Sequence, residues 1–409
     1  MKVYLVGGAV RDKLLNYPSD ERDWVVVGAN ADQMTSLGYT PVGNDFPVFL
    51  HPKTHEEYAL ARTERKSGHG YNGFTFYAAV DVTLEEDLAR RDLTINAIAQ
   101  SDTGELIDPY RGQEDLKNKI LRHVSPAFTE DPLRILRVAR FAARYRHLGF
   151  VIAEETMQLM RAVVDSGEVK YLVAERVWKE FSRALGERSP QHFIEVLRYC
   201  DALKVILPEL DQLFGVSQNL SYHPEIDTGL HTIFSLKRSA ELNLDTQARF
   251  AVLMHDLGKG LTPQENWPNH TNHEQTGAEL VKNLCKRLKV PNDYRELAIL
   301  TAKFHTHCHR ARELSAEETF KLLSQLDALR RPDRFQQFLL CCQADVQGRL
   351  GVESCVYPQK ELLLFAFNAI LSVSPAELVT EGFKGMELGA ELRLRRIKAI
   401  EKHPYSWPQ

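Results

Sequence analysis

The chain has 409 residues, of which 44% are hydrophobic and 26% charged, and its formal net charge is −4. This composition is typical of a globular protein with room for about two to four domains. We expect no secretory signal, and the longest apolar run, Leu362 to Phe367, is too short to span a bilayer. The six cysteines lack C-x-x-C spacing, so we expect reduced thiols in a cytoplasmic protein without a membrane partner. Because the net charge is negative, any nucleic-acid site would have to be a local basic patch.

The first predicted element is a buried strand from Val3 to Val6, where the residues are apolar and mostly β-branched. Gly7-Gly8 ends this strand, and helical spacing resumes from Ala9 to Leu15. A strand, a glycine turn and a helix in this order direct backbone N–H groups and a positive helix end toward a phosphate. On its own, however, a Gly-Gly pair is usually just a turn.

A second buried strand is predicted from Trp24 to Val27, with Glu21 and Asp23 at its entrance. Residues i and i+2 of an extended chain point the same way, so the two carboxylates share a face beside the glycine turn. Such a pair would hold Mg²⁺ over a triphosphate. The competing interpretation is a solvated Asp-Glu-Arg-Asp loop.

Taken together, these features resemble the first motif of the class II tRNA nucleotidyltransferase/poly(A) polymerase family, LVGGxVRD-x-LLG followed by DxD. Asn16 stands where the family usually has glycine, and Glu21 replaces the first aspartate. Glutamate is one methylene longer but is still a hard oxygen ligand. The resemblance implies that Gly8 and Arg11 bind nucleotide and that Glu21 and Asp23 are catalytic ligands of Mg²⁺.

The next stretch, Arg62 to Phe76, is rich in glycine and charge and is predicted to be a mobile surface loop. Asp87 to Ala97 then resembles the family's RRD[FL]TINA signature. In that signature Arg91 would reach the triphosphate, since a guanidinium fork matches phosphate oxygens. Alone, an Arg-Arg-Asp sequence is more often a surface ion pair or a helix cap. Residues 108–116 resemble a third motif, whose predicted role is to turn the chain and start a helix.

A helix is predicted to open at Glu130-Asp131-Pro132 and to run to about Tyr145. Asp131 before Pro132 is a favourable capping pair on local rules alone. The helix carries arginines along one stripe about 120° wide, with apolar side chains opposite. These arginines have no acidic residues between them, which argues against a merely solvated face: Arg134, Arg137, Arg140 and Arg144.

The family's EDxxR motif matches Glu130 to Arg134, and the resemblance implies that Asp131 and Arg134 read the incoming base. Cytosine and adenine both present an amino donor beside a ring-nitrogen acceptor, whereas uracil and guanine present a carbonyl and an N–H. A carboxylate and a guanidinium would therefore select C and A, because the wrong base leaves buried polar groups unpaired. Arg137 and Arg140 match positions that contact nucleotide in the family.

From Phe150 to about Gln218 the sequence predicts an all-helical neck. Further on, His231, His255-Asp256 and Asp345 appear in the order H…HD…D, which resembles an HD phosphohydrolase domain. The helix before His255-Asp256 is predicted to close at Gly258. Imidazoles and carboxylates suit a divalent ion with water as nucleophile. The ion would be either Mg²⁺ or a transition metal such as Ni²⁺.

The histidines also have a competing interpretation, because a lone helical histidine is more often a packed core residue. A second cluster, His305 to His309, contains three histidines and Cys308. Its members crowd onto about one helical turn, which disfavours a four-ligand zinc site. Near the end of the chain, the basic residues between Glu391 and Lys398 fit either a solvated helix face or a tRNA contact.

We therefore predict an α+β protein whose N-terminal head contains a mixed sheet and whose remainder is helical. The expected parts are a nucleotidyltransferase head, a helical nucleotide- or tRNA-binding neck, an HD phosphohydrolase domain and a helical tail: residues 1–140, 141–222, 223–346 and 347–409. The resemblance implies addition of CCA to the 3′ end of tRNA from CTP and ATP, with a second, metal-dependent phosphohydrolase activity. Poly(A) polymerase or partial CC- or A-adding activity stays open, as does an HD phosphohydrolase whose degenerate head only binds RNA. The sequence leaves monomer and homodimer equally open.

Overall fold

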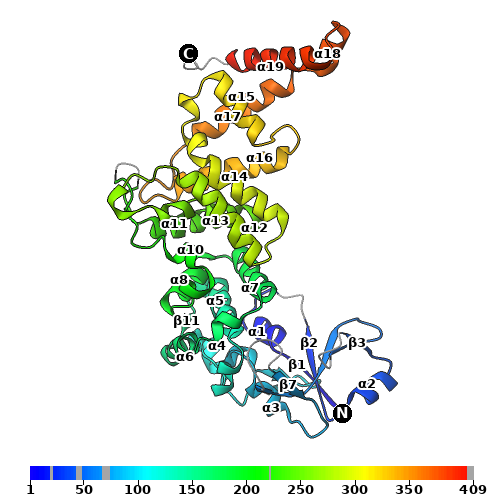
Figure 1. The fold of residues 1–409 in the computed structure, drawn as a ribbon. Helices are drawn as coiled ribbons and strands as arrows, with labels where there is room; N and C mark the ends of the chain where they lie inside the picture. Colours follow the sequence, from blue (N-terminus) through cyan, green and yellow to red (C-terminus); the bar gives the residue numbers. More distant parts are fainter. Residues whose placement is uncertain (19–21, 43–47, 67–73, 221–222, 403–409) are drawn as a thin grey trace. The chain divides into compact units, whose positions relative to one another are not determined.

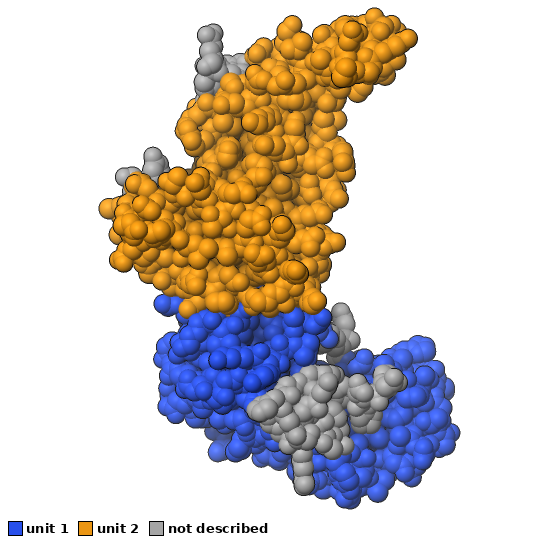
Figure 2. All heavy atoms as spheres, in the orientation of Figure 1, with its two compact units in different colours: residues 1–206 blue, residues 207–409 orange. Residues whose placement is uncertain are grey.

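The computed structural model describes residues 1–18, 22–42, 48–66, 74–220 and 223–402. The chain divides into two compact units, residues 1–206 and 207–409 (Figures 1 and 2). The first unit contains a sheet and helices, and the second is helical, which confirms the predicted α+β class. Glu21 lies outside the described residues.

The first unit is built on a mixed sheet in the order β3-β4-β5-β2-β1-β8-β9. Its strands are short: β1 (Lys2–Val6), β2 (Asp23–Val27), β3 (Thr40–Val42), β4 (Val48–Leu50), β5 (Glu57–Leu60), β8 (Ala99–Gln100) and β9 (Leu106–Ile107). Only β2 and β5 run parallel among the described pairs of this sheet. Both faces of β2 are covered, since Val25 and Val26 are buried in two different apolar clusters. This double burial explains the unbroken apolar run.

The stretch predicted to be a loop between Arg62 and Phe76 has strands at its ends, so that prediction was wrong there. Thr63–Lys66 (β6) pairs antiparallel with Phe74–Tyr77 (β7) in a separate two-stranded sheet. The reason lies in the residue types of β7, where aromatic and β-branched residues favour a strand. Residues 67–73 lie outside the described part of the chain.

Helices complete the first unit: α1 (Gly8–Leu14), α2 (Ala31–Ser36), α3 (Leu84–Ala89), α4 (Gly112–Asn118), α5 (Leu133–Tyr145), α6 (Glu154–Asp165), α7 (Ala174–Gly186), α8 (Gln191–Tyr199) and α9 (Leu203–Ile206). Helix α5 packs against α7 and α8. The neck was predicted to be purely helical from Phe150, but Val151–Ile152 (β11) pairs with Ile120–Leu121 (β10). Two β-branched residues before the N-terminus of α6 favour this short extended segment.

The described part of the second unit contains α10 (Pro208–Asp211), α11 (Thr228–Glu241), α12 (Thr246–Met254), η5 (Leu257–Leu261), α13 (His273–Arg287), α14 (Asn292–His309), α15 (Ala316–Gln325), α16 (Pro332–Gln347), α17 (Pro358–Leu371), α18 (Pro375–Thr380) and α19 (Gly385–Glu401). The short 3₁₀ turns η6 (Gln264–Asn266) and η7 (Ala311–Glu313) lie between these helices. Helices α11, α12, α14 and α16 pack against one another (Figure 1). Helix α12 is buried along almost its whole length, with Phe250, Leu253 and Met254 inaccessible. This buried helix delivers His255 and Asp256 into the interior of the unit.

Helix α12 ends at Met254 and not at Gly258, so the predicted glycine cap was wrong. Gly258 lies in the following 3₁₀ turn, η5, where its role is steric. A Cβ atom there would lie 2.0 Å from the carbonyl oxygen of His273. The turn therefore needs glycine because the backbone of α13 approaches it closely.

Among the described residues, Pro358–Thr380 is the one stretch long and apolar enough to cross a membrane, judged by length and composition only. The structure divides it between α17 and α18. Leu363, Ala366 and Ile370 are buried, and Phe367 packs on Phe335 of α16 with ring centroids 5.3 Å apart. One side of this stretch therefore packs against the rest of the second unit.

Candidate functional site

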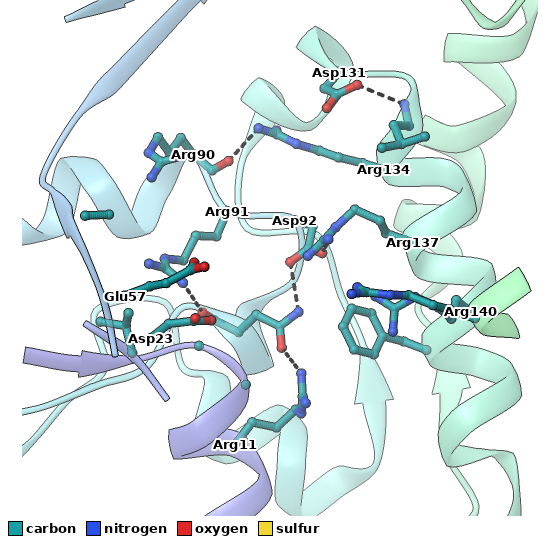
Figure 3. A pocket seen from close by; sticks show the side chains of 18 of the residues that line it. Arg11, Asp23, Glu57, Arg90, Arg91, Asp92, Asp131, Arg134, Arg137 and Arg140 are labelled. Atoms are coloured by element: carbon teal, nitrogen blue, oxygen red, sulfur yellow. Dashed lines mark hydrogen bonds and ion pairs between the residues drawn. The ribbon is translucent and has the colours of Figure 1, made fainter. Parts of the chain in front are cut away.

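A cavity of about 800 Å³ lies in the first unit beside the β1–α1 turn, the starts of β2 and β5, and helix α5 (Figure 3). The described predicted nucleotide and metal residues of this unit all line it: Gly8, Arg11, Asp23, Arg91, Asp131, Arg134, Arg137 and Arg140. Its lining is unusually rich in arginine, to which Arg62, Arg90, Arg144, Arg176 and Arg183 also contribute. A local basic patch therefore exists in a chain with negative net charge, and it suits a polyanion.

Two carboxylates stand side by side at the wall of this cavity. Asp23 and Glu57 are the first residues of β2 and β5 and are register partners in the parallel pair, and both side chains are exposed. Figure 3 shows them together below Arg91. Carboxylate oxygens from two neighbouring strands match the hard ligands that Mg²⁺ prefers, so the described residues fit this ion. Glu57 was missed in the sequence, where its only signal is a glutamate that opens a strand-like segment.

The glycine turn and two arginines form the next wall of the cavity. Arg11 is buried, donates to Asp12 Oδ1 at 2.8 Å and also donates to the side-chain oxygen of Asn96. Arg91 lies 3.2 Å from Asp87 Oδ2 and donates to the backbone oxygen of Asn96. Both guanidinium groups are thus fixed by protein contacts and line the cavity, which is the arrangement needed to receive phosphate oxygens.

Gly7 is required at this turn for two separate reasons. Its backbone has φ 66° and ψ −127°, a region that side chains other than hydrogen rarely tolerate. A Cβ atom at this position would also lie 2.8 Å from Nη1 of Arg91. The turn therefore allows the Arg91 guanidinium to lie directly against the backbone.

We expect Gly7→Ala to destabilise the protein by about 1–3 kcal/mol through backbone strain and, in addition, to displace Arg91. Urea unfolding would measure the first effect, and the KM for the nucleoside triphosphate expected from the sequence would rise several-fold through the second. Gly104→Ala is the matched control, because Gly104 has φ 89° but no atom within 4 Å of its Cβ position. It should lose similar stability with an unchanged KM. An unchanged KM in Gly7→Ala would contradict the role assigned to this contact.

The arginine stripe of α5 faces the cavity and not solvent. Arg134 and Arg140 are each only 6% exposed, which excludes the solvated-face interpretation for them. Nε of Arg137 donates to Asp92 Oδ2 at 2.7 Å, and Nε of Arg140 donates to Glu180 Oε2 at 2.6 Å. Burial acts to raise the pKa of Asp92, but the charge of Arg137 and its hydrogen bonds lower that pKa far below its usual range. These ion pairs hold the two arginines in place before any ligand binds.

The two predicted base-reading residues are present in the cavity but are engaged by protein groups. Asp131 Oδ1 accepts from the backbone N–H of Leu133, the first residue of α5, at 3.0 Å, although the N-cap residue of this helix is Pro132 and not Asp131 as expected. Asp131 Oδ2 accepts from Nη2 of Arg176 at 2.8 Å. Arg134 donates to the carbonyl oxygens of Ala127 and Arg90, each at 2.6 Å. A base that paired with these residues would therefore exchange with existing contacts, and Arg176 is a partner that the sequence did not reveal.

A second cluster lies inside the second unit. The four predicted residues His231, His255, Asp256 and Asp345 come from α11, the α12–η5 junction and α16, and all are buried. His231 Nε2 lies 3.0 Å from Asp345 Oδ1, and His255 Nε2 lies 3.1 Å from Asp256 Oδ2 and 3.7 Å from Asp345 Oδ2. In the described structure His255 Nε2 is buried without a hydrogen bond. Converging donor atoms with an unsatisfied nitrogen fit a divalent ion.

The charges of this second cluster reinforce one another. Burial acts to raise the pKa of Asp256 and of Asp345, but the neighbouring cations hold both values well below the usual range. Burial lowers the pKa of His255, yet Asp256 and Asp345 outweigh it and raise that pKa to about 9. Lys259 adds a further cation, with Nζ 2.7 Å from Asp256 Oδ2. The site therefore keeps both carboxylates ionised, and protons compete with any metal ion for its imidazole nitrogens.

Two further side chains support the predicted set. Glu225 Oε1 lies 2.9 Å from Nδ1 of His231, and His309 Nε2 lies 2.6 Å from Asp345 Oδ2. Such outer partners orient metal-ligating groups. His307 is exposed, and Cys308 accepts from the hydroxyl of Tyr357. None of the described candidate metal groups includes either of them.

Three family matches cover most of the chain. Residues 3–122 match the family described as "Poly A polymerase head domain", and residues 149–214 match "Probable RNA and SrmB- binding site of polymerase A". Residues 228–331 match the HD domain family. The first match includes Gly8, Asp23 and Arg91, and the third includes His231, His255 and Asp256.

Full-length relatives and solved structures agree with these matches. A "Multifunctional CCA protein" from Aliivibrio salmonicida is 59% identical over 98% of both chains, and one from Thioalkalivibrio sulfidiphilus is 58% identical over 100% of both. A CCA-adding enzyme solved with CTP has a TM-score of 0.64 at 20% identity, covering 98% of this chain and 86% of that one. A Thermotoga maritima CCA-adding enzyme complexed with tRNA has a TM-score of 0.63 at 20% identity, covering 98% and 88%. These structures share the fold of this chain.

Proposed function

The chain belongs to the family of multifunctional CCA proteins, and we propose on this premise that it adds C, C and A to the 3′ end of tRNA. CTP and ATP are the substrates, and no nucleic-acid template is needed. The observation that carries this proposal is the arginine-lined cavity, which unites the glycine turn, Asp23, Arg91 and the α5 arginines in one place.

The residues divide the work of nucleotidyl transfer between them. Asp23 and Glu21, with Glu57 beside Asp23, would hold Mg²⁺, which when bound stabilises charge on the attacking 3′-hydroxyl and the leaving pyrophosphate. Gly8, Arg11 and Arg91 bind the triphosphate. Arg137 and Arg140 are kept in position by Asp92 and Glu180 and orient the nucleotide.

The test is incubation of the protein with tRNA that lacks its 3′ end, together with labelled CTP and ATP. Addition of C, C and then A supports the proposal. Runs of A identify a poly(A) polymerase, and addition that stops after CC, or consists of A alone, identifies a partial enzyme. Absence of all incorporation alongside RNA binding identifies a degenerate head.

Base selection provides a sharper prediction. Asp131→Ala or Arg134→Ala should lower the use of CTP and ATP and raise the relative use of UTP or GTP by at least about tenfold. Asp131→Asn separates the two roles of this residue, because asparagine caps a helix as well as aspartate does but presents an amide to the base. Competition between the four labelled nucleotides measures the effect. Glu175→Ala, an exposed neighbour on α7, is the control. Unchanged selectivity in Asp131→Asn would favour the capping role alone.

The HD unit provides the second activity, metal-dependent hydrolysis of phosphate esters. The substrates we propose are 2′,3′-cyclic nucleotides, 2′-nucleotides and simple phosphomonoesters, which would let one chain clean a damaged tRNA end before rebuilding it. His231, His255, Asp256 and Asp345 hold the ion, for which Ni²⁺ and Mg²⁺ are the candidates.

The proposed organisation keeps the four parts expected from the sequence, residues 1–140, 141–222, 223–346 and 347–409. We place the protein in the cytoplasm, where tRNA is processed. The six cysteines support this compartment, since all are free thiols and five of them are buried.

A further inference from the structure

A second cavity lies within the second unit, beside the buried histidine–aspartate cluster described above. It has a volume of about 680 Å³ and is bounded by the turns η5 and η6, residues 267–272 and the start of α13. Pockets of this size hold small organic molecules. Gly258 and His273 both line it, and Nε2 of His273 lies 3.7 Å from Asp256 Oδ1. The cavity therefore borders the cluster to which we assign hydrolysis of phosphate esters.

The wall of this second cavity differs in charge from the arginine-lined cavity of the first unit. The described residues that line it include one carboxylate, Glu265, and neither lysine nor arginine. A phosphate group would meet no permanent cation there. The neighbouring cluster does supply one, because Nζ of Lys259 lies 2.7 Å from Asp256 Oδ2. The second cavity therefore suits the uncharged part of a substrate whose phosphate lies at the cluster.

The largest side chain in the wall is the half-buried indole of Trp267. Its Nε1 donates to the carbonyl oxygen of Thr262 at 3.0 Å, and its backbone N–H donates to the carbonyl oxygen of Gln264 at 3.1 Å. The indole is thus held in place before any ligand binds, which lowers the entropic cost of binding. Unpaired nucleobases stack on aromatic side chains of this kind.

Three asparagines line the same cavity, and all of them are exposed: Asn266, Asn269 and Asn272. Their backbone is fixed by turns, since the N–H of Asn266 donates to the carbonyl oxygen of Pro263 at 2.9 Å and that of Asn269 donates to the carbonyl oxygen of Asn266 at 2.8 Å. A side-chain amide offers both donors and an acceptor, so it can pair with the edge of any nucleobase. An indole with several amides around it is a combination that recognises a flat, polar ring.

We propose that the second cavity binds the nucleobase of the nucleotide whose phosphate is hydrolysed at the cluster. The base stacks on Trp267, the asparagine amides bond to its edge, and the ribose lies at the boundary near His273. The substrate class is the nucleoside 2′,3′-cyclic phosphate, either free or at the 3′ end of an RNA. This inference rests on the proposed phosphohydrolase function and deepens it by making that function prefer nucleotides over other phosphate esters.

The test compares two substrates of the full-length wild-type protein that differ only in the base. One is 2′,3′-cyclic AMP, and the other is methyl riboside 2′,3′-cyclic phosphate, which has the same ribose and cyclic phosphate but no base. Stacking of a base on one aromatic side chain strengthens binding by roughly five- to a hundredfold. The expected kcat/KM is therefore at least about fivefold higher for cyclic AMP, with most of the difference in KM.

Substitutions then assign this preference to the cavity. In Trp267→Ala the advantage of cyclic AMP over the base-free substrate should disappear, whereas Trp267→Phe keeps an aromatic ring and should retain most of it. Asn269→Ala should reduce the advantage several-fold, and its exposed position keeps the test open if Trp267→Ala does not fold. Gln264→Ala is the matched control, because this exposed residue of η6 does not line the cavity. An RNA that ends in a 2′,3′-cyclic phosphate should show the same dependence on Trp267 if RNA ends are the source of the base.

Equal kcat/KM values for the two substrates in the wild-type protein would overturn the base-binding cavity and leave the phosphohydrolase function intact. Absence of hydrolysis of both substrates would refute the phosphohydrolase function itself. A Trp267→Ala protein that loses activity on both substrates by the same factor would show a structural role for the indole, and this too would overturn the proposal. The comparison in the wild-type protein needs no substitution, so a folding defect in a variant does not affect it.

Discussion

The Asp23→Ala variant is expected to lose nucleotide addition by about 10³-fold or more while its affinity for tRNA changes little. We propose that this carboxylate serves the metal ion and not the RNA, and it stands beside Glu57 at the wall of the cavity. Loss of a bound Mg²⁺ removes several kcal/mol of charge stabilisation from the transition state, which corresponds to roughly this factor. Incorporation of labelled CTP into truncated tRNA measures the rate, and filter retention measures tRNA binding.

Two comparisons make this result interpretable. Glu105→Ala removes an exposed carboxylate of the same unit that does not line the cavity, so both activity and binding should be unchanged. Glu57→Gln should lower the rate as well, because its carboxylate is the strand neighbour of Asp23. Normal incorporation by Asp23→Ala would refute the carboxylate assignment, whatever the outcome for Glu57.

His255→Ala or Asp256→Ala should abolish hydrolysis of phosphate esters and leave CCA addition near normal. Each substitution removes a buried group on which the ionic cluster of the second unit depends, and the two active sites share no ligand. Removal of divalent ions from the wild-type protein should abolish hydrolysis in the same way. Hydrolysis should return when one kind of divalent ion is added back.

Thermal unfolding is the necessary companion measurement, because both residues are only 1% exposed. His307→Ala should behave as wild type in hydrolysis, since this exposed ring contributes to none of the described metal groups. Hydrolysis that persists in both His255→Ala and Asp256→Ala would mean that the metal cluster has been misinterpreted. The histidines would then be packed core residues.

Sequence reasoning was most successful where function follows from local order. The glycine turn, the buried strand β2 and the arginine stripe of α5 can each be identified from residues that lie a few positions apart in the sequence. The steric requirement at Gly7 and the helical spacing of the arginines are properties of single segments. The motif H…HD…D could also be identified, because the order of its residues along the chain does not depend on how the helices pack.

Sequence reasoning failed where two distant segments meet. Glu57 pairs with Asp23 only because β5 lies beside β2, and Arg176 reaches Asp131 only because α7 packs on α5. Strand order and helix packing depend on burial of apolar faces throughout the unit, which no short window contains. Gly258 was misassigned for the same reason, since its constraint is the approach of α13.

The residue types, their spacing and therefore the two kinds of chemistry were determined by the sequence alone, because hydrogen-bonding capacity and metal preference belong to individual side chains. Only the tertiary structure decided which of these side chains act together. In the folded chain the arginines of α5 line a cavity, and Arg176 donates a hydrogen bond to Asp131. The tertiary structure also brought Nε2 of His273 and of His305 to within 3.7 and 3.5 Å of Asp256 Oδ1. Grouping of this kind depends on distances of a few ångströms between segments that are far apart in the chain, and those distances are set by packing.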